Sequence, residues 1–69
     1  MERRRTDFLV TARGPERLSG NQLQVYQKVG ELGLCDEEEL RSALPDIYLV
    51  RETARELVRS GHLLRTGLT

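Results

Sequence analysis

The sequence predicts one small, mainly α-helical domain with three helices and a short strand near its C-terminus. Three amphipathic stretches, each bounded by capping or helix-breaking residues, predict the helices. Gly61 and the apolar residues that follow it predict the strand. The length of 69 residues allows a single domain with a small core.

Residues 1–17 are expected to form a flexible basic arm ahead of a domain over residues 18–69. The arm holds five arginines against three carboxylates, and Gly14-Pro15 interrupts any regular structure in it. The apolar residues 8–10 also suit a short edge strand, because aromatic and β-branched side chains favour strands. Both interpretations stay open at this point.

The first helix is predicted over about Gly20–Leu32. Ser19 and Gln22 stand at the two positions of an N-terminal capping box, and Gly33 is a suitable C-terminal cap. The apolar face expected to enter the core consists of Leu23, Val25, Tyr26, Val29 and Leu32.

A second, shorter helix is predicted from its acidic start. Asp36 is the expected N-cap, with Glu39 at the matching capping-box position, and carboxylates suit the positive end of a helix dipole. Pro45 requires the helix to end by Leu44. Its expected apolar face is Leu40, Ala43 and Leu44.

The third helix is predicted to begin at Asp46, as N-cap, and to stop before Gly61. Its apolar positions follow one narrow helical face: Ile47, Val50, Ala54, Leu57 and Val58. Residues 62–69 are expected to form a short strand that runs into a turn. His62 is expected at the surface or half-packed, not as a titrating switch.

The stretch Val50–Leu63 resembles the third helix and the start of the wing in a winged helix-turn-helix domain. In both, a helix with small and aliphatic core residues ends in a glycine, and an apolar residue opens a strand. The resemblance covers about residues 19–66 and implies three helices with a short or incomplete β wing. Two departures are the compact spacing from Leu40 to Val50, which includes a proline, and the absence of a second wing strand before Thr69. Either the wing has one strand, or residues 8–10 pair with it, or the chain is a fragment.

The exposed face of the third helix is the expected binding surface. It carries one tyrosine and three arginines: Tyr48, Arg51, Arg55 and Arg59. The winged-helix resemblance implies that this face enters the major groove of DNA, where an arginine fork can bind a guanine edge or a phosphate. The like-charged neighbours on the helix favour an anionic ligand. The alternative is a solvated face, balanced by Glu52 and Glu56 three residues before an arginine.

Four further arginines are expected to assist. Arg65 stands where the wing of the family meets phosphate, and Arg3, Arg4 and Arg5 resemble an arm that enters the minor groove. The same three residues are equally typical of a solubilising terminus.

Composition excludes several classes of function. One histidine, one cysteine and scattered glycines form no catalytic, zinc-binding or phosphate-loop pattern, so we expect no enzyme, no cofactor and no metal. No apolar run is long enough to span a membrane, and the single cysteine fits a reducing compartment, the cytoplasm or the nucleoid. The net charge is zero, but residues 31–46 hold six carboxylates against one arginine.

Two functions from different classes follow. The first is a small DNA-binding protein, a transcriptional regulator or a phage- or plasmid-type control protein, which acts as a homodimer on paired half-sites. The second is a winged-helix module that binds a protein partner through the acidic residues 36–39 and the exposed side chains of Tyr48 and Leu49.

Overall fold

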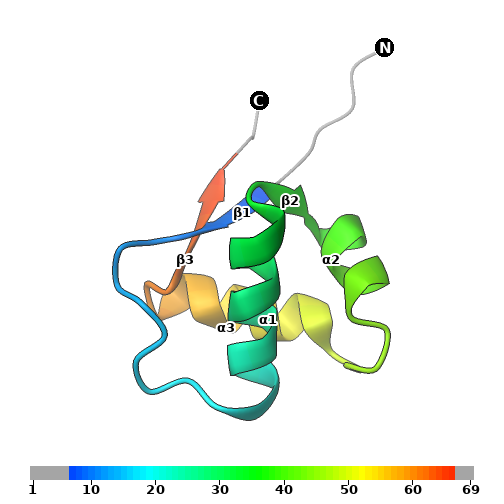
Figure 1. The fold of residues 1–69 in the computed structure, drawn as a ribbon, viewed down its shortest axis with the longest axis horizontal. Helices are drawn as coiled ribbons and strands as arrows, with labels where there is room; N and C mark the ends of the chain where they lie inside the picture. The colour runs from blue at the N-terminus through cyan, green and yellow to red at the C-terminus, as the bar shows by residue number, and fades with distance from the viewer. Residues whose placement is uncertain (1–6, 67–69) are drawn as a thin grey trace.

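The fold combines three helices with a three-stranded sheet. A computed structural model describes residues 7–66 of the chain. In chain order (Figure 1), the elements are β1 (Asp7–Val10), α1 (Gly20–Leu32), β2 (Cys35–Asp36), α2 (Glu37–Ala43), α3 (Val50–Arg59) and β3 (Leu63–Thr66). The three helices are confirmed, and the sheet is larger than the single C-terminal strand that we expected.

The sheet is antiparallel, with strand order β2-β1-β3. Phe8 pairs with Cys35 on one side and with Arg65 on the other. Residues 8–10 therefore form a strand, and it is the central strand of the sheet, not an edge strand or part of a tail. Three alternatives were open for the strand after Gly61. In the structure this strand, β3, pairs with residues 8–10.

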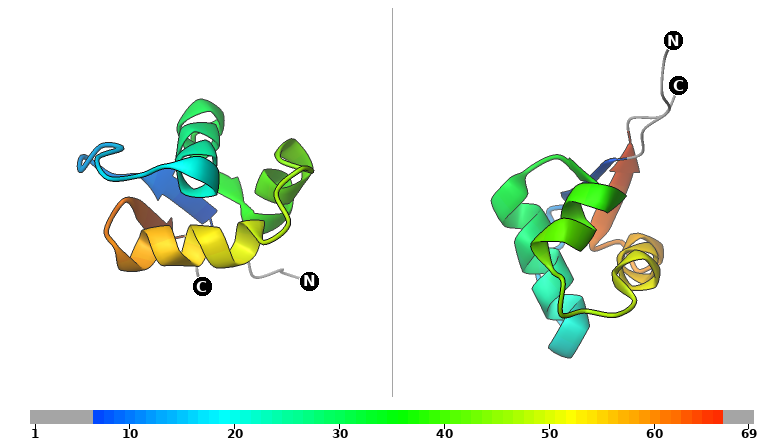
Figure 2. Two further views of the ribbon diagram at one scale, coloured as in Figure 1. Left: turned by 90° about the horizontal axis from the view of Figure 1, so that it is seen from below. Right: turned by 90° about the vertical axis from the view of Figure 1, so that its right-hand side faces the viewer.

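The helices pack against one another as well as against the sheet. In Figures 1 and 2, α1 crosses α3 at a steep angle, and α2 lies beside both near the start of α3. Ten apolar side chains from all six elements and the α2–α3 turn form the buried core: Phe8, Val25, Val29, Cys35, Leu40, Ile47, Val50, Ala54, Leu57 and Leu63. No helix among residues 7–66 is long and apolar enough to cross a membrane.

The first helix has the predicted bounds but a different start. Ser19 makes no side-chain cap hydrogen bond, and Gln22 Nε2 instead donates to Glu56 Oε1 of α3 at 3.4 Å. The expected capping box is therefore wrong. The C-terminal cap is confirmed, because the Gly33 N–H donates to the Val29 carbonyl at 2.9 Å with φ at +80°. The core-facing side of α1 is narrower than expected, and Leu32 at its end is exposed.

The second helix confirms its predicted start and end. The Glu39 N–H donates to Asp36 Oδ1 at 2.8 Å, and the Asp36 N–H donates to Glu39 Oε1 at 2.9 Å. These two bonds complete the capping box. The helix ends at Ala43, and Leu44 caps it directly before Pro45.

The third helix begins later than predicted. Its N-cap is Leu49, and Asp46 lies in the preceding turns, where the Ile47 N–H donates to the Leu44 carbonyl at 3.2 Å. The Leu49 carbonyl accepts from both the N–H and the hydroxyl of Thr53, at 3.0 and 2.8 Å. Ile47 is buried as expected, but it reaches the core from a turn, not from the helix.

The buried position of His62 corrects the expectation of a surface residue. Its Nδ1 lies 2.6 Å from Ser60 Oγ, and its Nε2 lies 3.0 Å from the Glu16 carbonyl oxygen. The Tyr26 ring meets the imidazole edge to face, with the ring centroids 6.5 Å apart. His62 thus ties the loop before α1 to the turn between α3 and β3.

Candidate nucleic-acid interface

Three arginines gather around one shallow depression on the surface. The depression has a volume of about 280 Å³ and is lined by Arg55, Val58, Arg59 and Arg65. All three arginines are exposed, and Val58 supplies a half-buried apolar wall. The third helix and β3 therefore contribute to one surface feature.

Helix periodicity and strand register explain why these residues meet. Arg55, Val58 and Arg59 follow the i, i+3, i+4 spacing that places side chains on one side of a helix. Arg65 is paired with Phe8, which is buried against the helices, and directly paired residues share one face of a sheet. Arg65 therefore leaves β3 on the face that is turned toward α3.

The arginines of this depression keep their charges available. Among residues 7–66, none of Arg55, Arg59 and Arg65 forms an ion pair with a carboxylate. The balancing pairs expected with Glu52 and Glu56 do not form, and Glu56 accepts from Gln22 instead. Three like charges around one concave surface focus a positive potential there, which attracts anions.

Arg51 lies in a different environment from the other arginines of α3. Its Nε lies 3.0 Å from Glu37 Oε2 of α2, and both side chains are partly exposed. Such an exposed pair contributes at most about 1 kcal/mol to stability. It does, however, place a carboxylate directly beside one of the arginines that we expected to contact DNA.

Tyr48 and Leu49 lie at the opposite end of α3 from the depression. Tyr48 is 91% exposed and Leu49 is 50% exposed, in the turn that joins α2 to α3. This turn and the C-terminal end of α3 lie on opposite sides of the view in Figure 1. The four residues expected to form one face of α3 therefore lie in three different environments. Tyr48 is at the exposed tip, Arg51 pairs with Glu37, and Arg55 and Arg59 line the depression.

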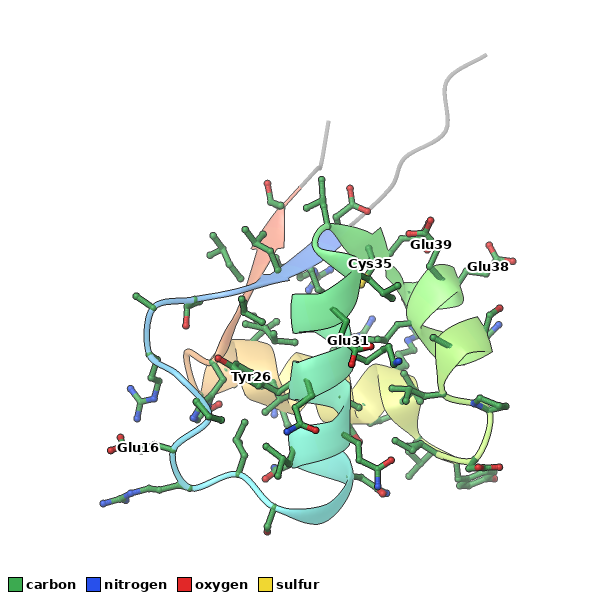
Figure 3. All side chains as sticks on the ribbon, in the orientation of Figure 1. Glu16, Tyr26, Glu31, Cys35, Glu38 and Glu39 are labelled. Atoms are coloured by element: carbon green, nitrogen blue, oxygen red, sulfur yellow. The ribbon has the colours of Figure 1, made fainter. Side chains whose placement is uncertain are left out.

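Most of the acidic run on α2 has a local role. Asp36 and Glu39 form the capping box, and Glu37 pairs with Arg51. Glu38 lies on the outer side of α2 and points away from the rest of the fold (Figure 3). The run thus offers a partner fewer unengaged carboxylates than its sequence indicates.

One further group of carboxylates was not anticipated from the sequence. Oxygens of Asp7, Asp36 and Glu39 all lie within 4.8 Å of one another, a spacing that would suit a cation. The pairing of Asp7 with Asp36 across β1 and β2 brings them together. Each of the three has a further interaction, and the capping box already occupies two of them.

Arg3, Arg4 and Arg5 lie outside the described residues. No protein-family model, no curated protein and no solved structure matches the chain.

Proposed function

We propose that the chain binds double-stranded DNA through α3 and β3, as a small regulator of transcription or of phage- or plasmid-type control. The observation that carries the proposal is the depression shared by Arg55, Arg59 and Arg65, whose charges meet no carboxylate in residues 7–66. Phosphate is the ligand that a cluster of arginine forks binds best, because each guanidinium can donate two parallel hydrogen bonds.

We further propose that the fold is a winged helix-turn-helix variant in which β1 takes the place of a second wing strand. Three features support this relation: three helices, a glycine after α3, and a strand that follows it. In such a domain α3 enters the major groove, which is wide enough to admit a helix.

The surface division on α3 gives the arginines different roles in this proposal. Arg55, Arg59 and Arg65 hold phosphates at the C-terminal end of α3, and Tyr48 meets sugars and base edges at its start. Arg51 is held by Glu37 and binds a phosphate only when that ion pair opens. The arginines at residues 3–5 add contacts in the minor groove. A single module buries limited surface, so specific binding uses two copies on paired half-sites.

Salt-dependent binding to DNA tests this proposal. The anisotropy of a labelled mixed-sequence duplex is measured with the protein between about 20 and 200 mM salt. We expect affinity to fall steeply with salt, with a log–log slope that loses roughly 0.9 for each phosphate contact removed. The variant Arg55→Gln/Arg59→Gln should therefore lose roughly 2 from the slope.

The control is Arg41→Gln, which removes the same kind of charge from the exposed side of α2. It should leave the slope nearly unchanged, because Arg41 does not line the depression. An equal loss of slope per charge removed in Arg41→Gln and in Arg55→Gln/Arg59→Gln, or no binding at the lowest salt, would rule out this interface.

A protein partner is the second candidate function, favoured by one observation. The exposed Tyr48 and Leu49 form an aromatic and aliphatic pair of the kind enriched at protein interfaces. The acidic surface contributes less to this function than the sequence indicates, since its carboxylates mostly make local contacts.

A further inference from the structure

The two ends of α3 carry complementary chemistry. At the start of the helix, the tip formed by residues 44–49 exposes Tyr48 and Leu49, with the exposed carboxylates of Asp46 and Glu52 on either side in sequence. At the other end lies the depression with one apolar wall and three arginines. The molecule therefore carries an exposed aromatic ring, flanked in sequence by two acidic residues, and also a concave basic surface.

The tip is held in a fixed position. The Leu49 carbonyl accepts two hydrogen bonds from Thr53, which fix the residue directly after Tyr48. The Ile47 N–H donates to the Leu44 carbonyl, and the Ile47 side chain is buried in the core, which fixes the residue directly before it. Tyr48 is therefore presented by a supported turn, and little backbone entropy opposes its insertion into a partner.

The tip of a molecule cannot reach the depression of that same molecule. Val58, the apolar wall of the depression, follows Tyr48 by ten residues, and at a rise of about 1.5 Å per residue the helix keeps the two roughly 15 Å apart. Any contact between the two features therefore joins two copies of the chain.

We propose that the tip of one copy inserts Tyr48 into the depression of a second copy. The ring packs against Val58, and the guanidinium groups of Arg55 and Arg59 lie against its face, an arrangement that attracts a cation to an aromatic ring. Asp46 and Glu52 of the inserting copy carry the charge opposite to that of the arginines around the depression, and Arg51 of that copy keeps its ion pair with Glu37.

Because the contact joins two different surfaces of the same molecule, it predicts chains of molecules. In a pair, the inserting copy keeps an unused depression and the receiving copy keeps an unused tip, so the contact is heterologous and continues into a ring or an open chain. The surface involved is smaller than that of a stable interface, so the association is weak and needs a high protein concentration. It uses the arginines that the proposed function assigns to phosphate, so DNA and a second copy compete for them.

Mixing two variants tests the proposal without DNA. Tyr48→Ala removes the inserted ring and keeps the depression, and Arg59→Glu reverses a charge in the depression and keeps the tip. In sedimentation velocity at low salt, with protein up to about 1 mM, the wild type should rise above its monomer mass of 7.9 kDa. Each variant alone should stay monomeric, and the equimolar mixture should regain a dimer and nothing larger, because one contact remains.

Controls separate this result from misfolding and from other surfaces. Tyr48 and Arg59 are exposed, so both variants should keep the circular dichroism of the wild type, and Arg55→Glu offers a second version of the depression variant. Leu64→Ala changes an exposed leucine on β3 that lines neither surface, and this variant should associate like the wild type.

Several outcomes would overturn the inference. These are a monomeric wild type at every concentration, self-association that survives Tyr48→Ala, loss of association in Leu64→Ala, or a mixture that stays monomeric. Because the measurement contains no DNA, a failure of DNA binding contradicts the proposed function and leaves this result standing. The reverse also holds, since a monomeric protein can still show salt-dependent DNA binding.

Discussion

Gly30 and Gly33, three positions apart at the end of α1, place opposite demands on the backbone. Gly30 is inside the helix, and a Cβ added there would meet Val10 Cγ1 at 3.7 Å, an ordinary contact. Gly33 follows the helix with φ at +80° and ψ at −117°, a conformation that side chains rarely allow. A Cβ there would meet no atom within 4 Å, so only the backbone conformation restricts the position.

The same substitution at these two glycines should therefore change stability in opposite directions. Gly30→Ala should raise the free energy of unfolding by up to about 1 kcal/mol, because alanine favours a helix over glycine. Gly33→Ala should lower it by about 1–3 kcal/mol through backbone strain. Urea unfolding followed by circular dichroism measures both, and equal effects of the two substitutions would contradict the assigned end of α1.

The second helix connects the acidic and basic parts of the molecule through one ion pair. Glu37 and Arg51 join α2 to α3, whereas Glu38, the next residue, points into solvent. The two glutamates carry the same charge on the same helix, and only one of them lies beside an arginine of the proposed interface. They form a matched pair for testing whether α2 limits binding to DNA.

Glu37→Gln should strengthen DNA binding more than Glu38→Gln does. Removing the Glu37 carboxylate releases Arg51 for a phosphate, which should steepen the log–log salt slope by roughly 0.9. Glu38→Gln makes the same change in net charge and should leave the slope close to that of the wild type. The anisotropy titration of both variants checks this, and identical slopes would show that Arg51 makes no contact with phosphate.

The net charge of the whole molecule is zero, but its acidic and basic residues are concentrated in different parts of the chain. They surround a small core. Within residues 7–66 the core consists of ten buried apolar side chains, so the stability margin is expected to be narrow. Leu57 is one of the largest fully buried side chains, and it comes from the helix that also carries the proposed interface.

Truncation of this leucine should unfold much of the population. Leu57→Ala in a core commonly lowers stability by about 2–5 kcal/mol, which is comparable to the whole margin of a small domain. Leu64→Ala is the control, because Leu64 is 53% exposed and its truncation leaves no cavity in the core. Thermal unfolding followed by circular dichroism compares them, and a Leu57 variant as stable as the control would refute the assigned core.

The sequence predicts most of the parts of this fold that depend on neighbouring residues, although the capping box expected at Ser19 does not form. The capping box of α2 and the glycine after α1 are local signals, and both predicted features are present. Asp46 and Leu49 show the limit, because a turn after Pro45 decides which residue caps α3, and the turn also serves to bury Ile47.

Features that depend on distant residues were less accessible from the sequence. Residues 8–10 become the central strand only because Cys35 and residues 63–66 supply partners on both sides. The arginines of α3 were predicted from helix periodicity, but the place of Arg65 beside them follows from strand register. The buried His62 needed knowledge of the loop that contains Glu16, whose carbonyl lies at its ring.

The central position of β1 has a consequence for the order of events during synthesis. The ribosome makes this strand before either of its partners, and pairing with β3 must wait until residues 63–66 have emerged. The helices contain local contacts and can form early, whereas closing the sheet joins positions near opposite ends of the described chain. A nascent chain that pauses before residue 63 therefore exposes one edge of β1, and a neighbouring chain can pair with that edge in place of β3.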